Sequence, residues 1–189
     1  MRSDFLVYEA KSFYNAYIAL EQLSKLDATS EFLLYVPMIV NGAFSIELTL
    51  KAILVKNNIS YGKDHNLLSL FRLLPNQFQR ELLTHLMEKA PEYVDTKKFV
   101  DEIVLLSNAF VDWRYAFEDN PAPAVDTRFL AAFANAAILT MFSHYNVDLV
   151  PSTKIVSDDE IEQKFHENRE LCKKTNLQRI EKKNKERHS

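Results

Sequence analysis

The fold of this chain is decided by one stretch, Asn41-Gly-Ala-Phe-Ser-Ile-Glu-Leu-Thr-Leu-Lys-Ala-Ile-Leu-Val55. Its apolar residues fall on every side of a 3.6-residue helix, so that no wide polar face is left. Such a helix belongs in the middle of a helical bundle, and this one is too short and too often interrupted by polar residues to be a membrane span. Glu47 and Lys51 stand four residues apart, so we expect them to pair with each other or to reach neighbouring helices.

The composition agrees with an all-α protein. Only two glycines occur in 189 residues, too few for the many turns of a β-sandwich or barrel. A single cysteine, Cys172, excludes an internal disulfide and a multi-cysteine zinc site. The N-terminus carries no signal-peptide pattern, so we expect a cytoplasmic protein that does not enter a membrane.

Apolar residues recur at helical spacing through six segments, which are separated by prolines and short polar turns. The short connections favour an up-and-down bundle in which neighbouring helices run antiparallel. Pro37 stands near enough to the start of the second helix to be tolerated or to leave a kink. The predicted helices span residues 4–26, 31–57, 65–74, 76–89, 96–118 and 126–146.

The composition changes near the C-terminus. We therefore divide the chain into a helical bundle, residues 4–146, an extended connector, 147–156, and a charged C-terminal helix or tail, 157–189. The body is slightly acidic and offers no broad surface for duplex nucleic acid. The basic run from Lys173 to Arg187 could bind RNA or dock on a partner protein, although such runs are usually solvated or disordered.

Three motifs resemble, in their order and spacing, those of a known helical family. They are Ser45-Ile-Glu-Leu-Thr-Leu-Lys-Ala-Ile-Leu54, Gly62-Lys-Asp-His-Asn-Leu-Leu-Ser-Leu-Phe71 and Phe110-Val-Asp-Trp-Arg-Tyr-Ala-Phe-Glu118, followed by a further helix after a proline-rich loop. This pattern resembles the HEPN superfamily of prokaryotic defence, toxin–antitoxin and signalling contexts. The resemblance covers roughly residues 5–146 and implies a helical bundle that pairs as a homodimer.

The family that this chain resembles includes metal-independent ribonucleases. Their motif is an arginine followed four to six residues later by a histidine. The histidine can move the proton of a ribose 2′-hydroxyl while the arginine stabilises charge on the phosphate. Arg114 matches the family arginine, but residues 115–121 contain no histidine, so the motif is degenerate and strong catalysis is not expected. Arg80 and His85 satisfy the spacing in an earlier helix, where so permissive a pattern often arises by accident.

The resemblance leaves several candidate site residues, each with a structural alternative. His65 could act as a base, or form a cap or hinge contact beside Asp64. Arg114 could bind a phosphate or a base together with its aromatic neighbours, or be the buried partner of Glu47. The candidate catalytic residues are Arg114, Glu118, Asp119, His65 and His85, and the candidate binding residues are Trp113, Arg114 and Tyr115.

We expect neither a metal nor a cofactor, because His85 and His144 each lack a second ligand at metal spacing. Three functions stay open. The first is a dimerising HEPN-like binding or regulatory module of a defence or toxin–antitoxin system, with RNA or a nucleotide as a possible ligand. The second is a metal-independent endoribonuclease with a non-standard acid or base. The third is a structural protein whose C-terminal helix docks on a partner. A surplus of aromatic residues in the first and sixth helices favours a homodimer.

Overall fold

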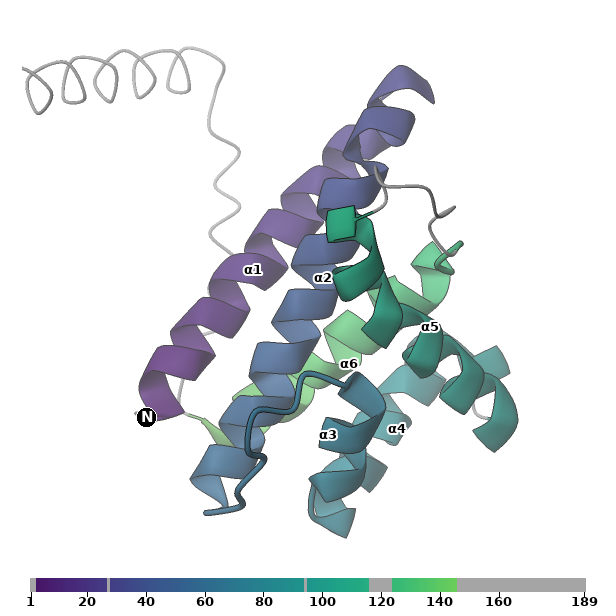
Figure 1. The fold of residues 1–189 in the computed structure, drawn as a ribbon. Helices are drawn as coiled ribbons and strands as arrows, with labels where there is room; N and C mark the ends of the chain where they lie inside the picture. Colours follow the sequence, from purple (N-terminus) through teal and green to yellow (C-terminus); the bar gives the residue numbers. More distant parts are fainter. Residues whose placement is uncertain (1–2, 27, 94, 116–123, 146–189) are drawn as a thin grey trace, which may run out of the picture. The chain divides into compact units, whose positions relative to one another are not determined.

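The computed structural model describes residues 3–26, 28–93, 95–115 and 124–145 (Figure 1), without the side chains of residues 3, 28, 30–32 and 109–115. Within the described residues it contains six α-helices, one 3-10 turn and no strand, so the predicted all-α bundle is confirmed. The elements are α1 (Ser3–Ser24), α2 (Ala28–Lys56), α3 (Leu67–Leu73), α4 (Asn76–Lys89), η1 (Pro91–Tyr93), α5 (Thr96–Tyr115) and α6 (Thr127–His144).

The helix boundaries agree with the predicted ones to within three residues wherever the main chain is described. The second helix begins earlier than predicted, at Ala28, and carries Pro37 inside its length. The predicted connector, 147–156, and the predicted C-terminal helix, 157–189, lie outside the described residues, as does the chain immediately after Tyr115.

α2 is the central helix of the bundle. α1 packs along it, and α3, α5 and α6 also contact it (Figure 1). Every residue from Ser45 to Leu54 is buried, as expected for a helix without a polar face. The stretch Leu33–Lys56 is long and apolar enough to cross a membrane, but 78% of its most apolar window is buried inside the bundle. That degree of burial is typical of a core helix.

Aromatic rings join α5 to α6. Phe129 and Phe133 stack with ring centroids 5.4 Å apart, and Phe99 meets them edge-on at 6.0 Å and 5.6 Å. Phe129 and Phe133 are fully buried, so these two aromatic residues of the sixth helix fill the core and provide none of the expected surplus surface. The exposed aromatic residues Phe5 and Tyr8 lie on α1.

Gly42 allows three helices to approach closely. A Cβ atom at this position would lie 2.8 Å from Leu130 Cδ1 on α6 and 3.1 Å from Tyr17 Cδ2 on α1. Both contacts are shorter than ordinary van der Waals distances, and both partner side chains are fully buried. Glycine disfavours the helical conformation, so its place in the middle of α2 is explained by this lack of space.

Enlarging Gly42 should therefore destabilise the protein. We expect Gly42→Val to lower the free energy of unfolding by about 1–3 kcal/mol, the usual effect of overpacking. Gly42→Ala should cost less, because the gain in helix propensity of about 1 kcal/mol offsets part of the clash. Urea denaturation of the two variants and the parent gives the free energies of unfolding and so their order of stability. A Val variant as stable as the parent would contradict the close approach.

Asp126 caps the N-terminus of α6. Its Oδ1 accepts hydrogen bonds from the backbone N–H of Arg128 (2.9 Å) and Phe129 (3.3 Å), and its Oδ2 accepts one from the Tyr93 hydroxyl (2.5 Å). Burial alone would raise the pKa of this carboxyl, but the hydrogen bonds from Tyr93, Phe129 and Arg128 outweigh it, so the pKa lies below its usual range. The ionised carboxylate thus stabilises the folded state.

The stabilisation by Asp126 should depend on pH. Because the folded pKa is lowered, the contribution is present above the unfolded pKa of about 3.9 and is lost as the pH falls through the folded value. We expect Asp126→Asn to lower the free energy of unfolding at pH 7 by about 1 kcal/mol, since neutral hydrogen bonds replace charge-assisted ones. The difference in free energy of unfolding between the variant and the parent should decrease steadily below about pH 4. A gap that stays constant down to pH 2 in denaturation measurements would show that the charge has no role.

Candidate functional site

A carboxylate and an ammonium group are buried side by side on α2. Glu47 is 3% exposed and Lys51 is 6% exposed, and Lys51 Nζ donates to Glu47 Oε1 at 2.7 Å. This contact confirms the pairing expected from their spacing. Each charge offsets the several kcal/mol that burying the other alone would cost. The ring of Tyr61, whose centroid lies 5.1 Å from Lys51 Nζ, adds a cation–π contact.

His65 joins this pair from the surface. Its Nδ1 lies 2.9 Å from Glu47 Oε1 and 3.5 Å from Lys51 Nζ, while its side chain is 64% exposed. A carboxylate at Nδ1 favours the tautomer with the proton on that nitrogen, which leaves Nε2 able to accept a proton. A buried carboxylate that orients an exposed imidazole is an arrangement suited to general acid–base chemistry.

The turn that carries His65 is fixed by its neighbours. Asp64 Oδ1 accepts from the Asn66 backbone N–H at 2.8 Å, and Asn66 caps α3 by accepting from Ser69 N–H at 2.9 Å. The Leu67 N–H donates to the Ser107 hydroxyl on α5 at 3.0 Å. The helix cap is therefore Asn66, so of the two structural roles expected for His65, a cap or a hinge contact, the cap is wrong.

The other predicted residues lie at the end of α5 or beyond it. Trp113, Arg114 and Tyr115 belong to the last turn of α5, and their side chains lie outside the described set. Glu118 and Asp119 also fall outside it. The proposed pair between Glu47 and Arg114 therefore stays a prediction.

Arg80 and His85 diverge on α4. Five residues turn a helix by about 140°, so the two side chains leave on different faces. Arg80 is exposed, whereas His85 is partly buried with its Nε2 4.0 Å from Glu81 Oε1 and its Nδ1 3.7 Å from Glu88 Oε2. This geometry gives no support to a shared phosphate site.

Glu81 of α4 contacts two residues at the end of α6. His144 Nε2 lies 2.7 Å from Glu81 Oε2, and the Ser143 hydroxyl donates to Glu81 Oε1. Burial would raise the pKa of this carboxyl, but the contacts with Ser143 and His144, helped by His85, lower it below its usual range. No group of three potential metal ligands is found within the described part of the chain.

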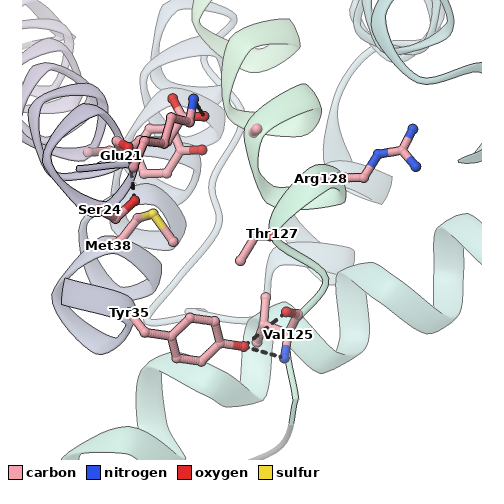
Figure 2. Close-up of a pocket in the computed structure, with 10 residues that line it drawn as sticks. Glu21, Ser24, Tyr35, Met38, Val125, Thr127 and Arg128 are labelled. Carbon is pink, nitrogen blue, oxygen red and sulfur yellow. Dashed lines mark hydrogen bonds and ion pairs between the residues drawn. The ribbon is translucent and has the colours of Figure 1, made fainter. Parts of the chain in front are cut away.

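Sequence analysis did not predict a pocket, and one lies between α1, α2 and α6 (Figure 2). Its larger chamber is an open hollow of about 680 Å³, and an adjoining open chamber has a volume of about 430 Å³. Tyr17, Glu21, Arg128 and Ala131 line both chambers. Tyr35 and Met38 of α2 close the larger chamber (Figure 2).

Most polar groups that line the larger chamber form hydrogen bonds or ion pairs with other lining residues. The Tyr35 hydroxyl donates to the Val125 carbonyl at 3.1 Å and accepts from the Val125 N–H at 3.3 Å (Figure 2). Glu21 Oε1 accepts from Lys25 Nζ at 2.9 Å. The Arg128 guanidinium extends away from Glu21 in Figure 2, and its Nη2 donates to Glu92 Oε1 at 2.6 Å.

Asn135 lines the smaller chamber and has one of its two polar atoms hydrogen-bonded. Asn135 Nδ2 donates to the Tyr14 hydroxyl at 3.0 Å, whereas Asn135 Oδ1 is buried without a hydrogen-bond partner in the described structure. Burial raises the pKa of Tyr14, although the Asn135 hydrogen bond opposes the rise, and burial with the charge of Glu21 raises the pKa of Tyr17. Both phenols keep their protons at neutral pH. The chamber thus offers neutral polar groups on an apolar wall, as small-molecule sites commonly do.

The buried pair on α2 can be compared with the more exposed pair of the same spacing at the end of α1, Glu21 and Lys25. We expect Lys51→Met to lower the free energy of unfolding by about 3–5 kcal/mol, since it leaves the Glu47 charge buried. Replacing both residues, as in Glu47→Leu with Lys51→Met, should cost much less than the sum of the single changes. Lys25→Met, which breaks the exposed contact to Glu21, should cost under about 0.5 kcal/mol. Additive losses in chemical denaturation would show that the buried charges do not depend on each other.

Comparison with known proteins bears on the same helices. Residues 16–132 match the family model described as HEPN domain, a span that includes α2, α3, α4, α5 and most of the pocket. No curated protein and no solved structure shows significant similarity to the chain. The match covers more than half of the 189 residues and confirms the resemblance carried by the three motifs. The chain therefore belongs to the HEPN domain family.

Proposed function

We propose that this HEPN domain is a binding or regulatory module of a prokaryotic defence or toxin–antitoxin system, and that it acts as a cytoplasmic homodimer without strong catalysis of its own. The family is associated with such systems. The observation that carries the binding role is the two-chambered pocket between α1, α2 and α6. Its ligand, on this proposal, is a nucleotide or a short stretch of RNA.

The lining of the pocket supports a ligand of this chemistry. Lys25 is paired with Glu21, which leaves Lys89 and Arg128 as the other cationic residues of the lining, and Arg128 also contacts Glu92. The charge balance of the lining thus favours an anion, and a guanidinium can bind a phosphate while it keeps its contact to Glu92.

The sequence after Arg114 supports binding rather than cleavage. A HEPN ribonuclease of the usual kind needs a histidine four to six residues after its arginine, and residues 118–120 are Glu, Asp and Asn. Without that base the arginine can still hold a phosphate, but it cannot activate the 2′-hydroxyl. Residues Trp113 and Tyr115 beside it would then contribute to binding by stacking.

One observation favours the alternative of a metal-independent endoribonuclease. The exposed imidazole of His65, oriented through Nδ1 by the buried Glu47, is arranged as a general base would be. Cleavage of single-stranded RNA in the presence of EDTA, lost in both His65→Ala and Arg114→Ala, would favour that alternative over a binding module.

Closing the pocket should remove binding without changing the fold. Ala131 lines both chambers and is only partly buried, so Ala131→Leu should reduce the volume of both. Arg128→Gln should weaken binding about tenfold, which corresponds to the loss of one charge-assisted contact. Calorimetry with a nucleoside triphosphate, and fluorescence anisotropy with a labelled RNA oligonucleotide, measure both effects.

Arg72→Gln is the matched control, because Arg72 is an exposed arginine on α3 that lines neither chamber. It should bind as the parent does. Parent-like binding by Ala131→Leu, together with loss of binding in Arg114→Ala, would move the ligand from the pocket to the end of α5.

A further inference from the structure

Each of the two cations that line the larger chamber is paired with a carboxylate. Lys25 Nζ donates to Glu21 Oε1 at 2.9 Å, and Arg128 Nη2 donates to Glu92 Oε1 at 2.6 Å. Glu92 lines neither chamber, although it contacts a residue that lines both. Because each pair is neutral as a whole, neither cation adds a net positive charge to the pocket.

Glu92 is held close to Arg128 by its neighbours. The next residue, Tyr93, is 2% exposed, and its hydroxyl donates to Asp126 Oδ2 at 2.5 Å. The other oxygen of Asp126, Oδ1, accepts the backbone N–H of Arg128 at 2.9 Å. One carboxylate thus fixes the two segments that carry the ion pair. Exposed ion pairs are usually weakened by the entropy of ordering their partners, and this shared anchor reduces that cost.

Lys89 is the remaining cation of the two linings. It is an exposed residue of the smaller chamber, and its side chain forms no hydrogen bond or ion pair with another described residue. The linings together with the partner of Arg128 therefore contain three cations and two carboxylates, which leaves one positive charge in excess. They are Lys25, Lys89, Arg128, Glu21 and Glu92.

We infer that Glu92 makes this pocket select a ligand with a single phosphate group, a nucleoside monophosphate or one nucleotide of an RNA strand, over a triphosphate. The inference rests on the nucleotide or RNA ligand of the proposed function and specifies its charge. The Lys89 ammonium attracts one phosphate, and Arg128 offers it the N–H groups that Glu92 leaves free. Each further phosphate would bring negative charge near Glu92 without an unpaired cation to balance it.

Glu92→Gln tests this role because it removes the charge and keeps the length of the side chain. Arg128 then adds a second positive charge in excess, and its attraction for a ligand grows with the charge of that ligand. In the full chain the variant should bind AMP about threefold more tightly than the parent does, and ATP at least about tenfold more tightly. The gain for ATP should decrease as salt is added, since ions screen exposed charges.

Calorimetry with AMP and ATP, in EDTA and at two salt concentrations, measures these effects. The parent should bind AMP at least as tightly as ATP. Lys89→Gln should weaken the binding of AMP about tenfold, since it removes the unpaired cation. The dinucleotide ApA, which has one phosphodiester, distinguishes the two sources of the ligand. Tighter binding of ApA than of AMP identifies an RNA strand, and weaker binding identifies the free nucleotide.

Asp101→Asn is the control, because it removes one negative charge from an exposed residue of α5 that lines neither chamber. It should leave both affinities unchanged, and circular dichroism confirms that each variant is folded. Glu92→Gln binding that is no tighter than that of the parent, or a parent that prefers ATP tenfold, would overturn the role of Glu92 while leaving the pocket as a ligand site. A parent that binds none of AMP, ATP and ApA would overturn the proposed ligand as well.

Discussion

A helix that is apolar on every side is stable in water only when other elements surround it, and the bundle depends on this requirement of α2. α1, α5 and α6 cover it, and Gly42 lets α1 and α6 approach without a side chain between them. The charges buried on α2 add a second condition, because Glu47, already paired with Lys51, also contacts His65 on the turn after α2. Apolar packing thus holds the helix in the bundle, while the polar cluster favours one rotation of it about its axis.

Helical spacing predicted the six helices well, since each buries an apolar stripe that depends on local sequence alone. It also predicted the contact of Glu47 with Lys51, which lie one turn apart. The link between Glu47 and His65 was not foreseen, because it depends on how the chain turns back after α2. The pocket was missed for a similar reason: Tyr17, Met38 and Ala131 come from three helices and form no motif in the sequence. Sequence spacing finds residues that share a helix, whereas sites between helices require their packing.

α1 has two separate roles in this arrangement. Its inner face packs against α2 and carries Tyr17, which lines the pocket. Its outer face carries Phe5 and Tyr8, which are exposed to solvent. A helix that is apolar on one face belongs to the core, and one that is apolar on two faces usually has a partner on each. The outer face thus leaves Phe5 and Tyr8 exposed on the side of α1 away from Tyr17.

The hydrogen bonds that join α6 to the rest of the bundle close very long loops. Tyr35 and Val125 are separated by 90 positions, and Tyr14 and Asn135 by 121, whereas α1 and α2 are consecutive helices joined by a short turn. Contacts between residues close in sequence form at little entropic cost. Contacts between residues far apart in sequence require the closure of a long loop, which costs more conformational entropy. The α1–α2 hairpin can therefore assemble early in folding, and α6 docks on it only once the intervening chain is in place. On a ribosome the pocket would therefore be completed only after α6 has been synthesised.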